Sequence, residues 1–342
     1  MNQITGRARV LDVLRGEPPS GRPVWLLRQA GRYLPEYRAL RRATSFLDLV
    51  RSPGLCTEAA LQPLRRFDLD ATIVFSDILV IPDALGAGLT FTPGDGPRIE
   101  RPVVSDEAFA ALQWEGACDR LLYVYDAVSE LRNAVPEHAL YGFAGAPWTL
   151  FCYLVQGEGG KDFAVARREL WRHPERSQAL LLRLGDVAGE HLRRQHVAGA
   201  DVVQVFDTWA GLLPAEDYEA LVYPALRRMA ERLRGIPWVM YARGGARHAA
   251  AFREMGALAV GVDATDSLSS IHGIATQGNL DSTRLLAGTD AAGLGAIEAG
   301  VRRIHDSLGG RSNHIYNLGQ GLLPETPPEA VAAFVAAVRA LP

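Results

Sequence analysis

Eight short apolar runs recur along the chain, and longer segments with helical periodicity separate them. Each run is rich in β-branched residues and is bounded by turn residues, which is typical of a buried strand. Strands that alternate with helices favour a parallel sheet whose connections are the helices. The eight predicted strands are 23–27, 71–79, 140–146, 201–206, 238–242, 257–262, 274–278 and 314–318. Eight such units predict an α/β fold, a (β/α)8 TIM barrel.

Amphipathic segments at 177–196 and 216–234, and a closing apolar stripe within 327–341, are predicted helices. A doubly wound open sheet is the competing topology. It is less favoured because no GxGxxG follows the first strand and because polar residues gather after many of the strands. No linker or repeat divides the chain, so we expect one barrel domain over residues 1–342.

Two glycine-rich segments are expected to be loops. The Pro/Gly-rich stretch 92–102 reads as a long surface loop within the domain. The polar segment GEGGKDF, residues 157–163, fits either a lid over an active site or a plain strand-to-helix connection.

The charge balance and the cysteines bear on the class of protein. There are 36 basic and 39 acidic side chains, a net charge of −3, which argues against a general nucleic-acid binder. No run reaches the roughly 18 apolar residues of a membrane span, and the first twenty residues lack a signal-peptide core. Cys56, Cys118 and Cys152 show neither a disulfide pattern nor zinc-ligand spacing. We therefore expect a cytoplasmic protein with no membrane partner.

Charged residues follow the first predicted strand and interrupt the second. Arg28 and Arg32 lie four apart, and in a helical turn they would share one side and clamp an anion. Asp77 is flanked by apolar sequence, where a carboxylate is costly without a task or a partner. Surface arginines, and a helix cap or ion pair for Asp77, are the alternatives. Asp83 fits an ordinary cap.

Polar residues follow the later strands as well. Tyr153, just after a small-residue turn at Pro147, fits either a cavity wall or the core. Asp207, Thr208 and Trp209 end a strand where barrels place functional groups, although a helix cap is the alternative for the first two. The remaining polar positions after strands are Arg243, Asp263, Gln277, Asn279, Asp281, Asn317 and Gln320. With no HExxH, P-loop or GxSxG, these residues indicate a barrel enzyme for a small anionic ligand and leave the reaction open.

Six segments resemble the uroporphyrinogen decarboxylase family, almost from end to end. They are PVWLLRQAGRYLPEYR, LQPLRRFDLDATIVFSDIL, GFAGAPWTLFCYLVQG, FDTWAG, QGNLD and NLGQGLLPETPPE. The resemblance implies a (β/α)8 barrel that converts the four acetate side chains of uroporphyrinogen III to methyl groups, giving coproporphyrinogen III and CO2 in haem biosynthesis. It implies a homodimer and no metal or organic cofactor, because the protonated pyrrole of the substrate serves as the electron sink.

The resemblance also implies roles for individual residues. Asp77 matches the aspartate that accepts hydrogen bonds from the pyrrole N–H groups and stabilises the cationic ring. Arg28 and Arg32 match two arginines that hold substrate carboxylates. Because an arginine pKa exceeds about 12, we assign Arg28 to the departing carboxylate rather than to proton donation. Tyr153 matches a tyrosine near the reacting acetate, and Thr208 matches a hydroxyl that binds a carboxylate.

One position departs from the family pattern. The usual NLGHG reads NLGQG here, so that Gln320 replaces a histidine. Glutamine can donate a hydrogen bond to a propionate but cannot carry a proton, so we expect a substrate-binding role. The substitution motivates one alternative, a non-catalytic tetrapyrrole-binding protein. A second alternative is a methyltransferase of the same superfamily, which the lack of neighbouring His and Cys ligands disfavours.

Overall fold

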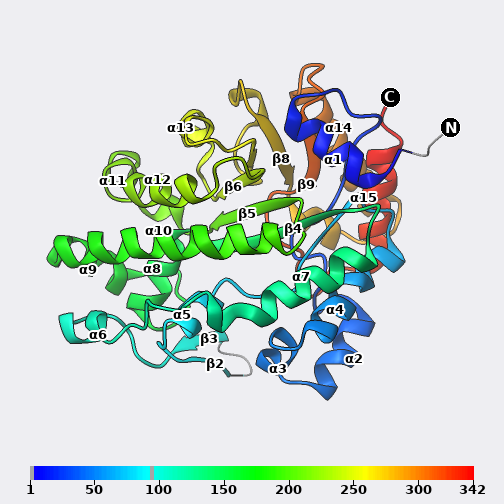
Figure 1. The fold of residues 1–342 in the computed structure, drawn as a ribbon. Helices are drawn as coiled ribbons and strands as arrows, with labels where there is room; N and C mark the ends of the chain where they lie inside the picture. The colour runs from blue at the N-terminus through cyan, green and yellow to red at the C-terminus, as the bar shows by residue number, and fades with distance from the viewer. Residues whose placement is uncertain (1–3, 93–95) are drawn as a thin grey trace.

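A parallel sheet of seven strands forms the centre of the computed structural model, which describes residues 4–92 and 96–342 (Figure 1). The strand order is β1-β4-β5-β6-β7-β8-β9, and every neighbouring pair is parallel. The strands are β1 (Ala71–Ile73), β4 (Ala139–Gly145), β5 (Val202–Asp207), β6 (Trp238–Ala242), β7 (Ala259–Gly261), β8 (Ala275–Leu280) and β9 (His314–Leu318). The predicted α/β barrel class is confirmed.

The predicted first strand, 23–27, is an extended segment between β9 and β1 rather than a regular strand. Tyr316 donates from its backbone N to the Pro23 carbonyl at 2.8 Å, and Val24 forms a single bridge to Tyr316. On the other side, the backbone N of Asp70 donates to the Val24 carbonyl at 2.8 Å. Pro23 has no N–H for a ladder, which limits the pairing. The segment nevertheless closes the barrel, with seven strands instead of the eight expected.

The predicted strand 71–79 was too long. Its ladder ends as β1 at Ile73, and residues 74–79 run away from the sheet into the short helix α5 (Val80–Ala84). The Asp77 carboxylate accepts a hydrogen bond from the Leu79 backbone N at 2.8 Å, which stabilises a turn instead of a strand. The prediction of a strand was wrong here because apolar residues also occur in loops that are packed against the core.

The expected loop at 92–102 is partly wrong. β2 (Leu89–Thr92) and β3 (Gly96–Ile99) form an antiparallel pair in which Leu89 lies opposite Ile99. The rest of this prediction, at 93–95, lies outside the described residues. Ile99 also donates from its backbone N to the Gly157 carbonyl at 2.6 Å, so pairing on both sides holds this stretch extended.

Helices cover the outside of the sheet (Figure 1). The predicted helix 177–196 is confirmed as part of α10 (Pro174–Val197), and 327–341 contains α15 (Pro328–Arg339). The segment 216–234 is two helices, because the ring of Pro224 prevents an uninterrupted hydrogen-bond ladder. Besides α5, the helices of at least five residues in the described chain are α1 (Gly6–Arg15), α2 (Pro35–Ala43), α3 (Phe46–Val50), α4 (Pro53–Arg66), α6 (Asp106–Ala110), α7 (Leu122–Ala134), α8 (Pro147–Gln156), α9 (Ala164–Arg172), α10 (Pro174–Val197), α11 (Ala215–Leu221), α12 (Tyr223–Arg232), α13 (Ala249–Glu254), α14 (Ala291–Ser307) and α15 (Pro328–Arg339), with one 3-10 helix at Ser282–Leu286.

The amino-terminal end of the barrel is filled with apolar side chains. Alternate residues of the strands point inward and form one apolar cluster, which α1 joins through Val10, Val13 and Leu14. A second and larger cluster lies between the sheet and the outer helices. Since α1 plugs the amino-terminal end, a ligand site is expected at the carboxyl ends of the strands.

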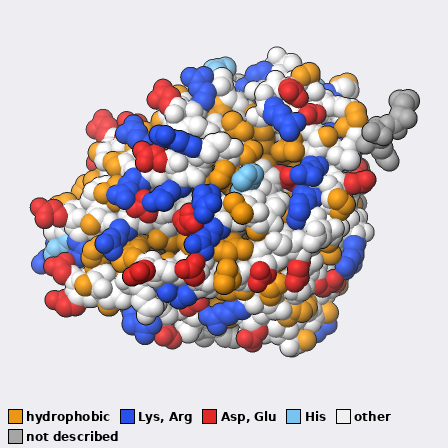
Figure 2. All heavy atoms as spheres, in the orientation of Figure 1, with side chains coloured by type: hydrophobic (Ala, Val, Ile, Leu, Met, Phe, Trp, Pro, Cys, Tyr) orange, Lys and Arg blue, Asp and Glu red, His pale blue; other side chains and the backbone are white. Residues whose placement is uncertain are grey.

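The outer surface mixes both signs of charge. Figure 2 shows arginines and acidic side chains interspersed over one face, with hydrophobic side chains between them. Within the described ranges, no helix is both long and apolar enough to cross a membrane.

Candidate active site

Three aromatic side chains line the inside of the barrel towards its carboxyl end. Phe143 of β4, Phe206 of β5 and Tyr241 of β6 occupy inward positions on neighbouring strands. Ring centroids are 5.7 Å apart between the first pair and 5.8 Å apart between the second. The two phenylalanines are only half-buried, so they offer an apolar surface to a ligand. These rings were not among the predicted site residues, although the alternation of inward and outward positions along each strand marks them.

Asp77 lies in the loop after β1 and is half-buried. Its Oδ1 accepts the Leu79 backbone N–H at 2.8 Å, and within the described chain no donor is bonded to Oδ2. Burial raises the pKa of Asp77, while the Leu79 N–H and the positive charge of Arg28 act in the opposite direction. The carboxylate therefore has one oxygen held in place and one available to a hydrogen-bond donor.

Arg28 is exposed at the end of the barrel-closing segment, and its charge lowers the pKa values of both Asp77 and Tyr153. Its backbone is left-handed, with a φ of 57°. The condition for Arg28 and Arg32 to share one side, a helical turn, is not met, since no helix precedes α2, which begins at Pro35. Arg32 is exposed, and its charge acts on Tyr37 instead. Arg28 thus lies within electrostatic reach of Asp77 and Tyr153, whereas Arg32 is not among the charges that shift the pKa of either group.

Tyr153 projects from α8 between two aromatic side chains. Its ring centroid is 5.2 Å from that of Phe163 and 6.4 Å from that of Trp209. Burial raises the pKa of the Tyr153 hydroxyl, and the nearby Asp77 charge raises it further. The phenol therefore stays protonated and serves as a hydrogen-bond donor.

The segment 157–163 connects two helices, α8 and α9, and is not a strand-to-helix connection. Its last residue, Phe163, is buried and left-handed with a φ of 44°, and its ring packs 4.7 Å from Trp209. The loop thus ends against the wall that holds Tyr153. Its role as a lid stays a prediction.

Asp207 and Thr208, at the end of β5, have different environments. Asp207 is fully buried and accepts hydrogen bonds from the Thr149 hydroxyl and the Tyr218 hydroxyl, both at 2.6 Å. Burial raises the pKa of Asp207 to about 6, against the effect of these two donors. Its contacts make it a structural residue of the β5 end. Thr208 is half-buried at the next position.

Gln320 follows β9 and is half-buried. Its neighbours on both sides contact other parts of the barrel end: the Gly319 carbonyl accepts the Tyr241 hydroxyl at 2.9 Å, and Gly321 lies against the Arg28 side chain. Gln320 therefore lies in the chain between a residue bonded to Tyr241 and one packed against Arg28, and its substrate-binding role stays a prediction.

The other polar residues predicted to lie at strand ends have different environments. Arg243 and Asp263 form a pair at the end of the barrel, with Nε and Oδ2 3.6 Å apart. Gln277 was placed wrongly: it is buried inside the barrel, where Oε1 accepts the Trp25 indole N–H at 3.0 Å. Asn279 donates to two backbone carbonyls, and Asp281 caps the short helix after β8.

Asp83 does not cap a helix as expected; it lies within α5 and pairs with Arg51 at 2.7 Å. The three cysteines are buried and free. No group of three or more His, Cys, Asp or Glu side chains is arranged to hold a metal ion in the portions described, 4–92 and 96–342.

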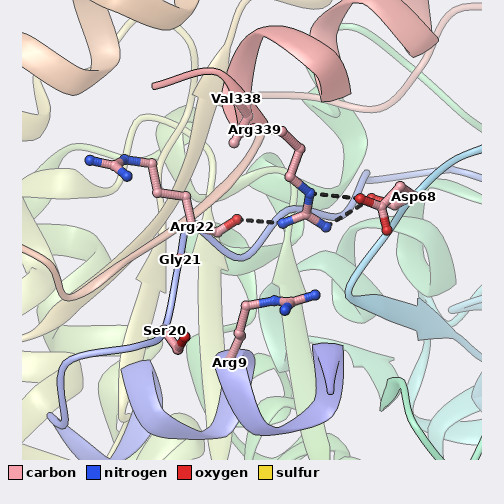
Figure 3. Close-up of a pocket in the computed structure, with 7 residues that line it drawn as sticks. All are labelled: Arg9, Ser20, Gly21, Arg22, Asp68, Val338 and Arg339. Atoms are coloured by element: carbon pink, nitrogen blue, oxygen red, sulfur yellow. Dashed lines mark hydrogen bonds and ion pairs between the residues drawn. The ribbon is translucent and has the colours of Figure 1, made fainter. Parts of the chain in front are cut away.

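A polar hollow of about 260 Å³ lies elsewhere, near the amino-terminal end of the barrel. Figure 3 shows Arg339 of α15 reaching Asp68 and the Arg22 carbonyl, with the Arg22 guanidinium turned away. Arg9 and Arg339 both pair with the buried Asp70, at 2.7 and 2.9 Å. These charges already satisfy one another, so the hollow is best described as an ion-pair cluster that joins α1, α15 and the barrel.

Comparisons with known proteins agree over nearly the whole chain. The family model described as Uroporphyrinogen decarboxylase (URO-D) matches residues 5–341. A uroporphyrinogen decarboxylase of Ralstonia pickettii is 43% identical, with 95% of this chain and 92% of the relative aligned. The corresponding protein of Sinorhizobium fredii is also 43% identical, over 97% of this chain and 98% of the relative.

Two solved structures share the fold. A methyltransferase from Methanosarcina mazei superposes with a TM-score of 0.76 at 20% identity, covering 98% of both chains. A B12-independent methionine synthase from Shewanella has a TM-score of 0.57 at 11% identity, covering 93% of this chain and 95% of that one. At these identities the likeness concerns the barrel alone.

Proposed function

This chain belongs to the uroporphyrinogen decarboxylase family, and we propose that the carboxyl end of its barrel carries the reaction of that family. The protein is a carboxy-lyase of haem biosynthesis, a uroporphyrinogen decarboxylase. In the finer proposal, the four acetate side chains of uroporphyrinogen III become methyl groups, and the products are coproporphyrinogen III and CO2.

Asp77 provides the central observation for this proposal. A carboxylate with one free oxygen among the described residues lies in the loop after β1, within electrostatic reach of the Arg28 cation and of Tyr153. In the proposed reaction a proton first adds to a ring carbon of one pyrrole, and the pyrrole N–H groups of the substrate donate to Asp77. The bond between the acetate methylene and its carboxylate then breaks, CO2 leaves, and the electron pair of that bond enters the cationic ring, which leaves an exocyclic methylene. A proton from water adds to this methylene to give the methyl group, and the ring carbon releases the proton it had gained, so that one proton replaces CO2 overall. The negative charge of Asp77 stabilises that ring while it exists.

The remaining residues are assigned to substrate binding. Arg28 holds the carboxylate that departs, and Arg32, on the same loop, meets another carboxylate of the substrate. Tyr153 donates its hydroxyl hydrogen close to the reacting acetate. Thr208 and Gln320 donate to side-chain carboxylates from the ends of β5 and β9. The half-buried rings of Phe143 and Phe206 support the apolar faces of the tetrapyrrole.

Three further properties are proposed with this function. The substrate ring supplies the electron sink, so the reaction proceeds without a metal or an organic cofactor. The family resemblance supports a homodimer, which light scattering during gel filtration tests. Three buried, free thiols fit a reducing compartment such as the cytoplasm.

The deciding experiment is an anaerobic incubation of the purified protein with uroporphyrinogen III and no added metal. Chromatography of the oxidised porphyrins then follows the loss of carboxylates. Products with seven down to four carboxyl groups are expected to appear progressively. Binding of the porphyrinogen without conversion would instead support the non-catalytic tetrapyrrole-binding protein, with Gln320 as the first residue to examine.

A further inference from the structure

Arg28 adopts a backbone conformation that its residue type disfavours. Its φ of 57° lies in the left-handed region, which is unfavourable for a residue with a Cβ. Such a conformation persists only where the surroundings hold it. The contacts of the residues on either side of Arg28 therefore show what sets the direction of its guanidinium.

Leu27, immediately before Arg28, is held by the end of β9. Asn317 is fully buried, and its Oδ1 accepts the backbone N–H of Leu27 at 2.8 Å and that of Leu318 at 2.7 Å. The Leu27 carbonyl accepts the Leu322 backbone N–H at 3.1 Å. Both backbone polar groups of Leu27 are thus bonded to the segment that contains Gln320.

Gln29, immediately after Arg28, is held by other partners. Its backbone N donates to the Leu26 carbonyl at 3.1 Å, and its side-chain amide donates to the Thr72 hydroxyl at 3.2 Å. The Tyr33 hydroxyl donates to the Gln29 carbonyl at 2.8 Å. Arg28 is therefore the one residue of this turn that projects outward between two fixed neighbours.

The Arg28 side chain also lies against the backbone of Gly321. A Cβ added at Gly321 would be 2.4 Å from Arg28 Cδ and 2.7 Å from Cγ, so glycine leaves the space that the side chain occupies. The same stretch of chain, 317–322, thus determines both the backbone of Arg28 and the path of its side chain.

We infer that Asn317 is a positioning residue, which acts through Leu27 to direct the Arg28 guanidinium towards Asp77 and the substrate carboxylate. This inference rests on the proposed function and adds a residue to which no role was assigned above. The side-chain Nδ2 of Asn317 is buried with no partner among the residues described, so Asn317 holds Leu27 through its Oδ1 alone.

A purely structural role for Asn317 predicts a different pattern of variant effects. If Asn317 acts through Arg28, its loss has no further consequence once the Arg28 side chain is removed. If it only stabilises β9, its loss has the same effect whether or not that side chain is present. A double-mutant cycle separates the two cases.

The experiment compares Asn317→Leu, which removes the acceptor, with Asn317→Asp, which keeps one, each with and without Arg28→Ala. We expect Asn317→Leu to lower kcat/KM about tenfold or more, and Asn317→Asp to restore most of that loss. In the Arg28→Ala background, Asn317→Leu is expected to change kcat/KM less than about twofold. An equal fold-change in both backgrounds, or no loss in the wild-type background, would overturn the inference.

Gly321→Ala is the second route, and it applies even if Asn317→Leu does not fold. Its methyl group meets the Arg28 side chain, so the same loss is expected with Arg28 present and little loss with Arg28→Ala, where the space is free. Equal losses of kcat/KM in the two backgrounds would contradict the positioning of Arg28 by residues 317–322.

Uroporphyrin, the oxidised and unreactive form of the substrate, supplies a readout that does not depend on turnover. Its Kd is measured for the same set of variants by quenching of tryptophan fluorescence, and the same coupling between positions 317 and 28 is expected. A wild-type protein that fails to convert uroporphyrinogen overturns the proposed function, whereas additive Kd changes overturn the positioning role of Asn317.

Discussion

At the scale of single residues, the site depends on how burial and charge act on Asp77. Burial raises its pKa, and Arg28 opposes that change. If the reaction needs the ionised form, kcat/KM falls as the pH decreases through this raised pKa. The acid limb of the pH profile should therefore lie at a higher pH than an ordinary aspartate gives, and Arg28→Ala should move it higher still, because the opposing charge is lost.

Asp77→Asn tests the same charge directly. The amide oxygen still accepts the Leu79 N–H, so we expect a folded protein with kcat lower by a factor on the order of 100, since a charge matched to the cationic ring is lost. Circular dichroism tests whether the variant is folded, and steady-state kinetics measures its kcat. Asp83→Asn is the matched control, because Asp83 pairs with Arg51 and should leave kcat unchanged. Unaltered turnover in Asp77→Asn would remove Asp77 from the mechanism.

Gln320→His restores the residue that the family pattern leads us to expect. If position 320 only binds a carboxylate, histidine should lower KM several-fold and change kcat little. Initial rates over a range of uroporphyrinogen III concentrations separate the two parameters. A large increase in kcat at constant KM would show instead that a titrating group is needed there, and would contradict the binding role.

At the scale of elements, helix packing depends on small residues that the hydrophobic pattern does not reveal. Gly185 of α10 lies against α12, and a Cβ there would be 2.4 Å from the Ala225 carbonyl oxygen. α10 as a helix was predicted from its periodicity, but this close approach was not. Similarly, the apolar residues 74–79 suggested a strand, whereas the hydrogen bond between Asp77 and Leu79 makes a turn that places the carboxylate at the barrel end.

Gly185→Ala is expected to destabilise the protein by about 1–3 kcal/mol, because the two helices must move apart. Gly295→Ala in α14 is the control. That glycine is exposed with no atom within 4 Å of the added Cβ, so alanine should stabilise by about 0.5–1 kcal/mol. Urea unfolding measures both free energies. Equal stability of the two variants would show that α10 and α12 tolerate a wider spacing.

At the scale of the whole molecule, buried histidines couple stability to pH. Burial lowers the pKa of His191 and of His314 to about 3, from an ordinary value of 6.5. Above pH 6.5 both histidines are neutral in the folded and the unfolded protein. As the pH falls from 6.5 towards 3, they bind protons only in the unfolded chain, so the free energy of unfolding decreases by at most about 5 kcal/mol for each histidine. Asp207 has the opposite effect, because its pKa is raised to about 6 in the folded protein. Its protonation as the pH falls increases the free energy of unfolding by about 3 kcal/mol over the same range.

We therefore expect the free energy of unfolding to decrease by several kcal/mol between pH 7 and pH 4, as urea titrations at a series of pH values would show. His314→Gln should reduce the decrease, because glutamine can still bond to Thr276 and Gly278 but does not titrate. A pH profile of His314→Gln parallel to that of the wild type would mean that His314 makes no contribution to it.

The alternation of strands and helices, the barrel class, the family and the polar residues near the strand ends were all predictable from the sequence. These are local properties: periodicity, turn residues and motif spacing record what each segment buries. Three outcomes came from the fold alone: 23–27 closes the barrel through few hydrogen bonds, Gln277 is interior, and the charge of Arg28, but not that of Arg32, acts on Asp77. Those outcomes depend on contacts between residues far apart in the chain, such as Asn317 with Leu27 and Gly321 with Arg28. No window of sequence contains both partners, so packing in three dimensions had to select them.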